Sequence, residues 1–286
     1  MRLKVKVPAT FGRLGWEIEG LGLAVTLYNE LFFEKAKQWE FIGFPSPANV
    51  YENLVKSCME KTFWYAKIPL MPFKVSLIQC IPIGIGLGFN PSLISASVVA
   101  ANYFLDKRFS PTNLLNIAST IHGSYEALGP ALFGNLCSSY QYDGEVKNIQ
   151  YQADDSFVFT HLIAKNTIDD NNEMVKTPIQ DFSYRLAKAI NLPKALETGN
   201  LTLIRELIAN QANEASFFKA INDSSSLIDF CKQQPFPYFL NDKAKTMTFI
   251  SKQPISHLLR DLKLGNSWEM ITLSIDKKGT IFEAIL

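Results

Sequence analysis

Apolar and polar residues alternate along much of the first 35 positions, most regularly from Leu21 to Phe33, and this period of two predicts β-strands. The wider spacing of apolar residues over Ala48–Thr62 predicts a helix, and the apolar segment Phe73–Cys80 predicts a further strand. Strands and helices therefore alternate early in the chain, which indicates a protein of mixed α and β structure.

The remaining segments continue this mixture. The apolar run Pro91–Leu105 predicts a buried helix, and a shorter helix is predicted to begin near Pro111, with Ser110 or Thr112 as its N-cap, and to end near Thr120. Further segments are predicted as helices over Tyr125–Phe133, Asp181–Leu196 and Leu201–Gln211, as strands over Asn148–Gln152 and Ser156–Ile163, and as a loop over Asn166–Glu173. We place a domain boundary near residue 150, which predicts two domains, 1–150 and 151–286.

The amino-acid composition argues against two classes of binding partner, nucleic acids and membranes. The chain has 286 residues, of which 47% are apolar and 19% charged, and this balance is typical of a folded protein with a sizeable core. Its net charge of +1, from 28 basic and 27 acidic residues, predicts neither a nucleic acid nor an anionic membrane as partner. The apolar stretch Val75–Leu105 is interrupted by prolines and glycines, so we expect no membrane span there.

The cysteines and the opening residues indicate a compartment. The four cysteines are scattered without a close pair, which predicts neither a zinc site nor a disulfide framework and favours a reducing environment. The chain opens with an alternating strand pattern, so we expect no secretory leader. Together these features predict a cytoplasmic protein.

Three glycines at a spacing of two, Gly84, Gly86 and Gly88, come directly before the predicted buried helix. Glycines let a backbone turn tightly, and a helix N-terminus offers free N–H groups that attract anions. The first helical turn, however, carries Phe89 and Pro91, where small residues with amide donors would serve an anion better, because the phenylalanine ring would fill space that a phosphate needs and proline has no N–H. The stretch is therefore either a phosphate-binding loop with an altered first turn or a glycine-rich turn that binds nothing.

Four segments carry a family resemblance. Pro82–Gly88 resembles motif 2 of the GHMP small-molecule kinases, and of homoserine kinase in particular. Val7–Ala24 resembles motif 1 of that family, and its frame is kept at Pro8, Ala9, Leu14, Gly15, Leu21 and Gly22. Glu52–Val55 resembles the segment that lies near the nucleotide base, and His122–Leu136 resembles the later motif that includes the magnesium ligand.

The resemblance implies an α+β, two-domain GHMP-kinase fold, with a ribosomal-S5-domain-2-like N-terminal domain and a ferredoxin-like C-terminal domain. It implies ATP and Mg²⁺ as cofactors and the ATP-dependent phosphorylation of homoserine, a step of threonine biosynthesis. The partner would then be a small, amino-acid-like metabolite, and the assembly a homodimer.

Matching positions imply the site residues. The positions that match catalytic residues of the family are Arg13, His122 and Glu126, with Glu126 also the candidate metal ligand. The positions that match nucleotide-binding residues are Asn53, Gly84, Gly86, Gly88, Asn90, Ser92 and Thr246. The positions that match substrate-binding residues are Arg13, Glu19 and Thr167.

Several of these positions depart from the family's pattern. Arg13 replaces an asparagine, His122 replaces the glutamate that binds magnesium, and no arginine follows Thr167 where the family holds its substrate carboxylate. The family's second glycine loop matches Leu240–Phe249, which has no glycine and reads as a charged turn. We therefore predict that kinase activity is weak or lost. The alternatives are an active kinase with rewired site residues, and a non-catalytic metabolite-binding or structural partner.

Overall fold

A computed structural model of the chain describes residues 1–14, 20–165, 167, 182–208, 214–221, 224–262 and 267–285. The chain forms two compact units. The first unit contains Met1–Arg13, Gly20–Gln150 and Asp276–Leu286, and the second contains Leu14–Glu19 and Tyr151–Ile275. The chain thus passes to the second unit after Gln150 and returns to the first at Asp276. The assignment of 1–150 and 151–286 as two family domains stays a prediction.

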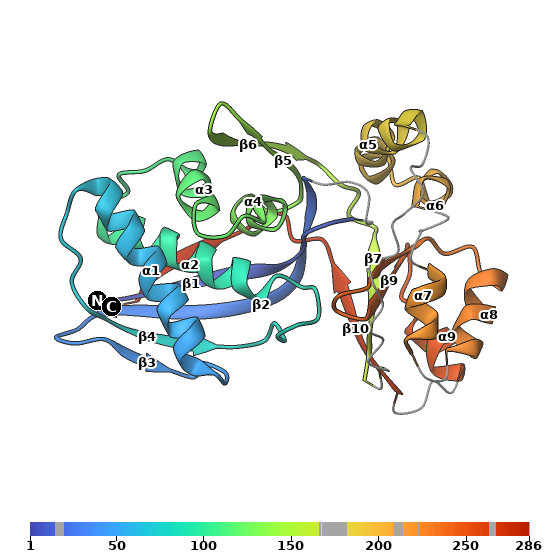
Figure 1. Cartoon of the computed structure of the whole chain (residues 1–286), viewed down its shortest axis with the longest axis horizontal. Helices are drawn as coiled ribbons and strands as arrows, with labels where there is room; N and C mark the ends of the chain where they lie inside the picture. Colours follow the sequence, from blue (N-terminus) through green and yellow to red (C-terminus); the bar gives the residue numbers. More distant parts are fainter. Residues whose placement is uncertain are drawn as a thin grey trace. The chain divides into compact units, whose positions relative to one another are not determined.

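The first unit is built on a seven-stranded sheet with the order β11-β1-β2-β4-β3, in which β5 also pairs with β2 and with β6 (Figure 1). Its strands are β1 (Arg2–Phe11), β2 (Leu21–Lys35), β3 (Glu40–Ile42), β4 (Phe73–Ile78), β5 (Leu136–Tyr142), β6 (Glu145–Tyr151) and β11 (Ile281–Ile285). β1 runs antiparallel to β2 and β11, whereas β3 and β4 are parallel. The alternation predicted for the first 35 residues is confirmed, but β5 and β11 were not predicted.

Four helices belong to the first unit: α1 (Ala48–Ala66), α2 (Phe89–Phe104), α3 (Pro111–Ser119) and α4 (Tyr125–Phe133). The central helix, α2, packs against α1, α3 and α4 as well as β1 and β2, which is why almost all of its residues are buried. α3 begins as predicted, because the Ser110 side chain accepts a hydrogen bond from the Asn113 amide and completes a capping box. α2 begins at Phe89, two residues before the predicted Pro91.

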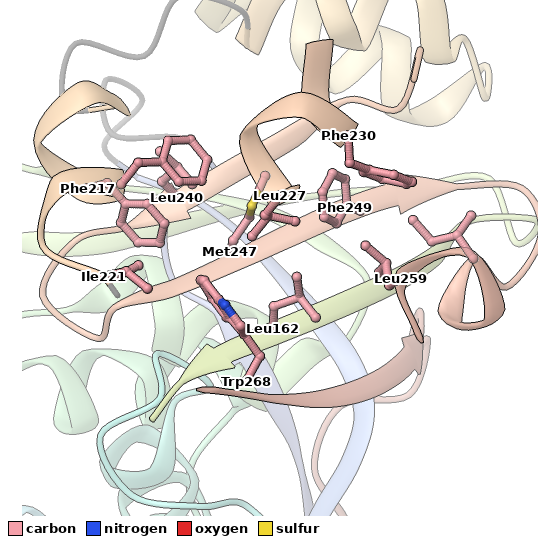
Figure 2. Packing of buried hydrophobic residues seen from close by; sticks show 12 residues of the cluster. Leu162, Phe217, Ile221, Leu227, Phe230, Leu240, Met247, Phe249, Leu259 and Trp268 are labelled. Carbon is pink, nitrogen blue, oxygen red and sulfur yellow. The ribbon is translucent and has the colours of Figure 1, made fainter. Parts of the chain in front are cut away.

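The second unit holds a four-stranded antiparallel sheet with the order β10-β7-β9-β8. Its strands are β7 (Val158–Ala164), β8 (Tyr238–Asn241), β9 (Thr246–Ser251) and β10 (Trp268–Ser274), and its helices are α5 (Phe182–Glu197), α6 (Leu201–Ile208), α7 (Glu214–Lys219), α8 (Ser225–Gln233) and α9 (Ser256–Asp261). Figure 2 shows Phe217 of α7 and Phe230 of α8 beside Met247 and Phe249 of β9, in one buried apolar cluster. This cluster holds α7, α8 and α9 on one face of the sheet.

The segment Leu240–Phe249 is a β-hairpin. Leu240 pairs with Met247, and the turn between the strands carries an ion pair from Lys245 to Asp242 at 2.7 Å. The expected charged turn is therefore present. Elsewhere, no helix among the described residues is both long and apolar enough to cross a membrane.

Candidate active site

The glycine loop enters α2 through three left-handed residues. Gly84, Gly86 and Gly88 have φ angles of 80°, 75° and 70°, a region that residues with a Cβ atom rarely occupy. Gly88 is the N-cap of α2 and lies directly against the side chain of Thr10. The Thr10 amide also donates to the Leu87 carbonyl oxygen at 3.1 Å. The loop is thus tied to the end of β1 and presents its exposed part, at Gly84, to solvent.

The first turn of α2 differs from the expectation that an aromatic ring fills the space of a phosphate. The Phe89 side chain is buried and its ring contacts Tyr51 of α1 edge-on, with ring centroids 5.1 Å apart. Phe89 and Asn90 occupy the first two helical positions, where backbone N–H groups have no partner within the helix. Pro91 lacks an N–H, so the loss of donors in this turn is confined to one position.

Ser92 faces inward. Its hydroxyl donates to the Phe89 carbonyl oxygen at 2.6 Å and accepts from the Asn29 side-chain amide at 2.9 Å, and both Ser92 and Asn29 are fully buried. Asn90, by contrast, is exposed beside the loop. Of the two polar residues expected to touch phosphate in this turn, Asn90 alone has a solvent-facing side chain.

A second group of polar residues lies where α4 begins. The Arg13 guanidinium Nε lies 3.3 Å from Glu126 Oε1, and the Ser124 hydroxyl donates to the same oxygen at 2.7 Å. His122 Nδ1 accepts the Ser124 amide at 3.2 Å. Burial lowers the pKa of His122 below 6.5, although the nearby Glu126 carboxylate acts in the opposite direction. The fold therefore brings together all three predicted catalytic positions, Arg13, His122 and Glu126. Together with Ser124 they form a group that we name the Arg13 cluster.

The end of β1 joins the glycine loop to the Arg13 cluster. Thr10 contacts the loop, whereas Gly12 lies so close to α4 that an added Cβ would be 3.1 Å from the Ala127 Cβ. An added Cβ on Gly22 would overlap the Glu126 carbonyl oxygen, so only glycine fits there. These close approaches leave room only for small residues here, and they bring the glycine loop and the start of α4 against the same end of β1.

The chain is similar to known proteins in sequence and in fold. Residues 53–135 match the model of the GHMP kinases N terminal domain. The chain is similar to the homoserine kinase of Clostridium botulinum strain 657, with 25% identity over 292 residues that cover 98% of each chain. The chain is therefore similar to GHMP kinases over almost its whole length. Its fold is that of the homoserine kinase from Cytophaga hutchinsonii, with a TM-score of 0.77, 16% identity and coverage of 99% and 97% of the two chains.

The same GHMP kinase fold is shared by the mevalonate diphosphate decarboxylase of Enterococcus faecalis, with a TM-score of 0.70 at 13% identity and coverage of 100% and 99% of the two chains. The predicted α+β fold is thereby confirmed. At these identities the likeness to solved structures establishes the fold, and the chemistry has to be argued from the residues of this chain.

The remaining predicted site residues belong to other elements of the first unit, to the second unit, or to the part of the chain outside the described residues. Asn53 is exposed on α1. Thr246 is buried on β9 of the second unit, where it pairs with Asn241 and Ile163. Thr167 forms an isolated bridge with Ile221. Glu19 lies outside the described residues. Among the residues that are described, no group of three or more His, Cys, Asp or Glu side chains is arranged to hold a metal ion.

Sequence reasoning missed Ser124 of the Arg13 cluster, and it also missed Asn29 beneath the glycine loop. Asn29 sits in β2 at the same phase as Leu31 and Phe33, which are buried against the core. An amide at a position where the alternation calls for an apolar side chain is the signal that marks it, because a buried polar group needs hydrogen-bond partners.

Proposed function

We propose that the protein is a homoserine-kinase-like member of the GHMP family that binds the phosphates of a nucleotide at the glycine loop and an amino-acid-like metabolite near the Arg13 cluster, with ATP-dependent phosphorylation of homoserine weak or lost. The observation that carries this proposal is a contrast within one site. The loop keeps the backbone geometry of an anion-binding site. In the Arg13 cluster, by contrast, the Arg13 guanidinium and the Glu126 carboxylate pair with each other.

The loop fits a phosphate group. Its three left-handed glycines lead into a helix of 16 residues, and the N-terminus of such a helix carries partial positive charge. The exposed Asn90 side chain supplies a further polar group there. ATP, when bound, would supply the phosphoryl group. The related decarboxylase of Enterococcus faecalis is described as an ATP-binding protein, which supports a nucleotide as the ligand class.

The residues present fit a magnesium ion less well. Mg²⁺ prefers oxygen ligands, and imidazole, which stands here at His122, suits softer metals. The one carboxylate of the Arg13 cluster, Glu126, accepts hydrogen bonds from Arg13 and Ser124 at the same oxygen. A guanidinium in that place opposes the approach of a cation. We therefore expect slow phosphoryl transfer, because removing one preorganised electrostatic group costs on the order of 10²-fold in rate.

One observation favours the second candidate, an active kinase with rewired residues. The Arg13 side chain is half exposed, and a cation at the edge of a phosphoryl-transfer site stabilises the charge that develops there. In such a rewired kinase, the Arg13 guanidinium would separate from Glu126 and contact the ligand instead. The purely structural partner is the third candidate, and it predicts no response to either ligand. A cytoplasmic location and a homodimer also stay predictions.

Ligand-dependent melting separates these candidates. A ligand that binds only the native state raises the melting temperature. A rise with homoserine but not with ATP supports a metabolite-binding role, a rise with both supports a nucleotide-dependent function, and no rise with either supports the structural partner.

A coupled ADP-release assay with homoserine, ATP and Mg²⁺ then measures turnover, beside the variant Pro91→Ala, which restores the one amide donor that the first turn of α2 lacks. We expect little turnover by the wild type and more by the variant, provided that circular dichroism shows both to be folded. Turnover by the wild type at the roughly 1–100 s⁻¹ that is common for kinases would contradict weak activity and select the rewired kinase.

A further inference from the structure

Asn29 lies where the chain leaves the central sheet for the glycine loop. The pairing of β2 with β4 ends at Glu30 and Ile78, so the backbone amides that follow Ile78 have no strand partner. The side chain of Asn29 replaces the missing strand partner, because its Oδ1 accepts hydrogen bonds from the backbone amides of both Cys80 and Ile81 at 2.9 Å. Ile81 is fully buried, and a buried amide without a partner would be costly.

The other end of the same side chain reaches the helix that follows the loop. Asn29 Nδ2 donates to the Ser92 hydroxyl at 2.9 Å, and that hydroxyl donates to the Phe89 carbonyl oxygen at 2.6 Å. The Ser92 amide, in turn, donates to the Gly88 carbonyl oxygen at 3.0 Å. One buried side chain therefore connects the residues that enter the loop with the first turn of α2 that leaves it.

We propose that Asn29 is the positioning residue of the glycine loop: it fixes the distance between the loop's entry and exit and so sets where the amides of the α2 N-terminus point. The buried side chains of Ile85 and Leu87 anchor the loop, but the three left-handed glycines around them have no side chains to restrict their backbone, so hydrogen bonds from neighbouring residues have to fix its shape. An asparagine suits this task because its amide offers an acceptor at one end and donors at the other. Neither alanine nor a hydroxyl residue supplies both at that reach.

The chain provides a matched control in Asn102, near the other end of α2. Asn102 is also buried, and its side chain also makes two backbone contacts to a loop, accepting the Phe109 amide at 2.8 Å and donating to the Phe109 carbonyl oxygen at 2.9 Å. Loss of either asparagine removes a comparable buried amide from the same unit. Only Asn29 contacts the glycine loop and the helix N-terminus.

The first test follows backbone amide exchange by mass spectrometry in Asn29→Ala and Asn102→Ala. We expect residues 79–92 to exchange roughly ten-fold or more faster in Asn29→Ala, because the hydrogen bonds of two amides are lost, while Asn102→Ala changes residues 105–112 and leaves 79–92 as in the wild type. Ser92→Ala, which removes one arm of the connection, should give an intermediate effect. Equal exchange of residues 79–92 in Asn29→Ala and Asn102→Ala would overturn the proposal.

The second test measures binding of ATP and of inorganic triphosphate by calorimetry, and this arm rests on the proposed function. We expect affinity to fall about ten-fold in Asn29→Ala and to stay within two-fold of the wild type in Asn102→Ala. Asn29→Asp keeps an acceptor for both amides and should recover part of the affinity. If the wild type binds neither probe, the proposed function fails while the exchange result still decides the role of Asn29. Equal affinity losses in the two alanine variants would show a merely structural role.

Discussion

Replacing Gly88 by alanine probes how tightly the glycine loop is held. Gly88 has a φ of 70° and is the N-cap of α2, and an added Cβ would run into the hydroxyl of Thr10 well inside van der Waals contact. Gly84 offers a matched control in the same loop. Its φ is 80°, but an added Cβ would meet nothing within 4 Å. The two substitutions therefore share the backbone strain and differ in the steric contact.

The magnitudes follow from these two terms. Forcing a residue with a Cβ into the left-handed region costs about 1–2 kcal/mol, and crowding a packed site adds about 1–3 kcal/mol. We expect Gly84→Ala to lower the free energy of unfolding by about 1–2 kcal/mol and Gly88→Ala by about 2–5 kcal/mol. The Thr10 hydroxyl is buried and has no hydrogen-bond partner among the described atoms, so Thr10→Ala should relieve the crowding without breaking a hydrogen bond.

Urea unfolding followed by far-ultraviolet circular dichroism measures all four proteins: the two glycine variants, Thr10→Ala, and Gly88→Ala combined with Thr10→Ala. The double variant should lose less stability than the sum of its two single variants, which is the coupling expected of residues in contact. Equal losses for Gly84→Ala and Gly88→Ala, or strict additivity in the double variant, would refute the reasoning.

Three further predictions concern the Arg13 cluster and the helix that precedes it. Arg13→Asn removes the guanidinium from Glu126 and should raise ADP release on the order of ten-fold in the coupled assay, and an unchanged or lower rate would argue for a productive role of Arg13. Since the pKa of His122 lies below 6.5 in the fold, the unfolded chain binds more protons as pH drops under about 6.5, so stability should decrease there. His122→Gln should show a shallower decrease between pH 7.5 and 5.5 in urea midpoints, and parallel curves would count against this. Ser110→Ala removes the capping box of α3 and should cost about 1 kcal/mol in the same unfolding assay, whereas a loss within error would mean that water replaces the cap.

Most of the fold could be predicted from local patterns. Part of the strand prediction for Leu21–Phe33 rests on true alternation, because burial alternates from Asn29 to Phe33, whereas Leu21–Val25 are all buried. The start of α3 is recognisable from its capping residues. β11 could not be read in this way, since all five of its residues are exposed and no alternation exists. It forms because residues at the two ends of the chain pair, as Arg2 does with Ile285.

The candidate site was predictable only in part. The motifs pointed to Arg13, His122 and Glu126 by position, but the ion pair joins residues 113 apart in the chain. The same motifs led us to expect Phe89 in the path of a phosphate, whereas its ring packs against Tyr51. The direction of a side chain at the start of a helix depends on what packs beside it.

The amino-acid sequence by itself determined the strands and helices whose residues repeat with a regular period, the glycines that a left-handed loop requires, and the family to which the motifs belong. Only the tertiary structure decided that Arg13 pairs with Glu126, that Ser92 turns inward, and that Asn29 holds both ends of the glycine loop. The physical reason is that periodicity and backbone preference act between near neighbours, whereas a buried hydrogen bond depends on which distant segments the folded core brings within about 3 Å.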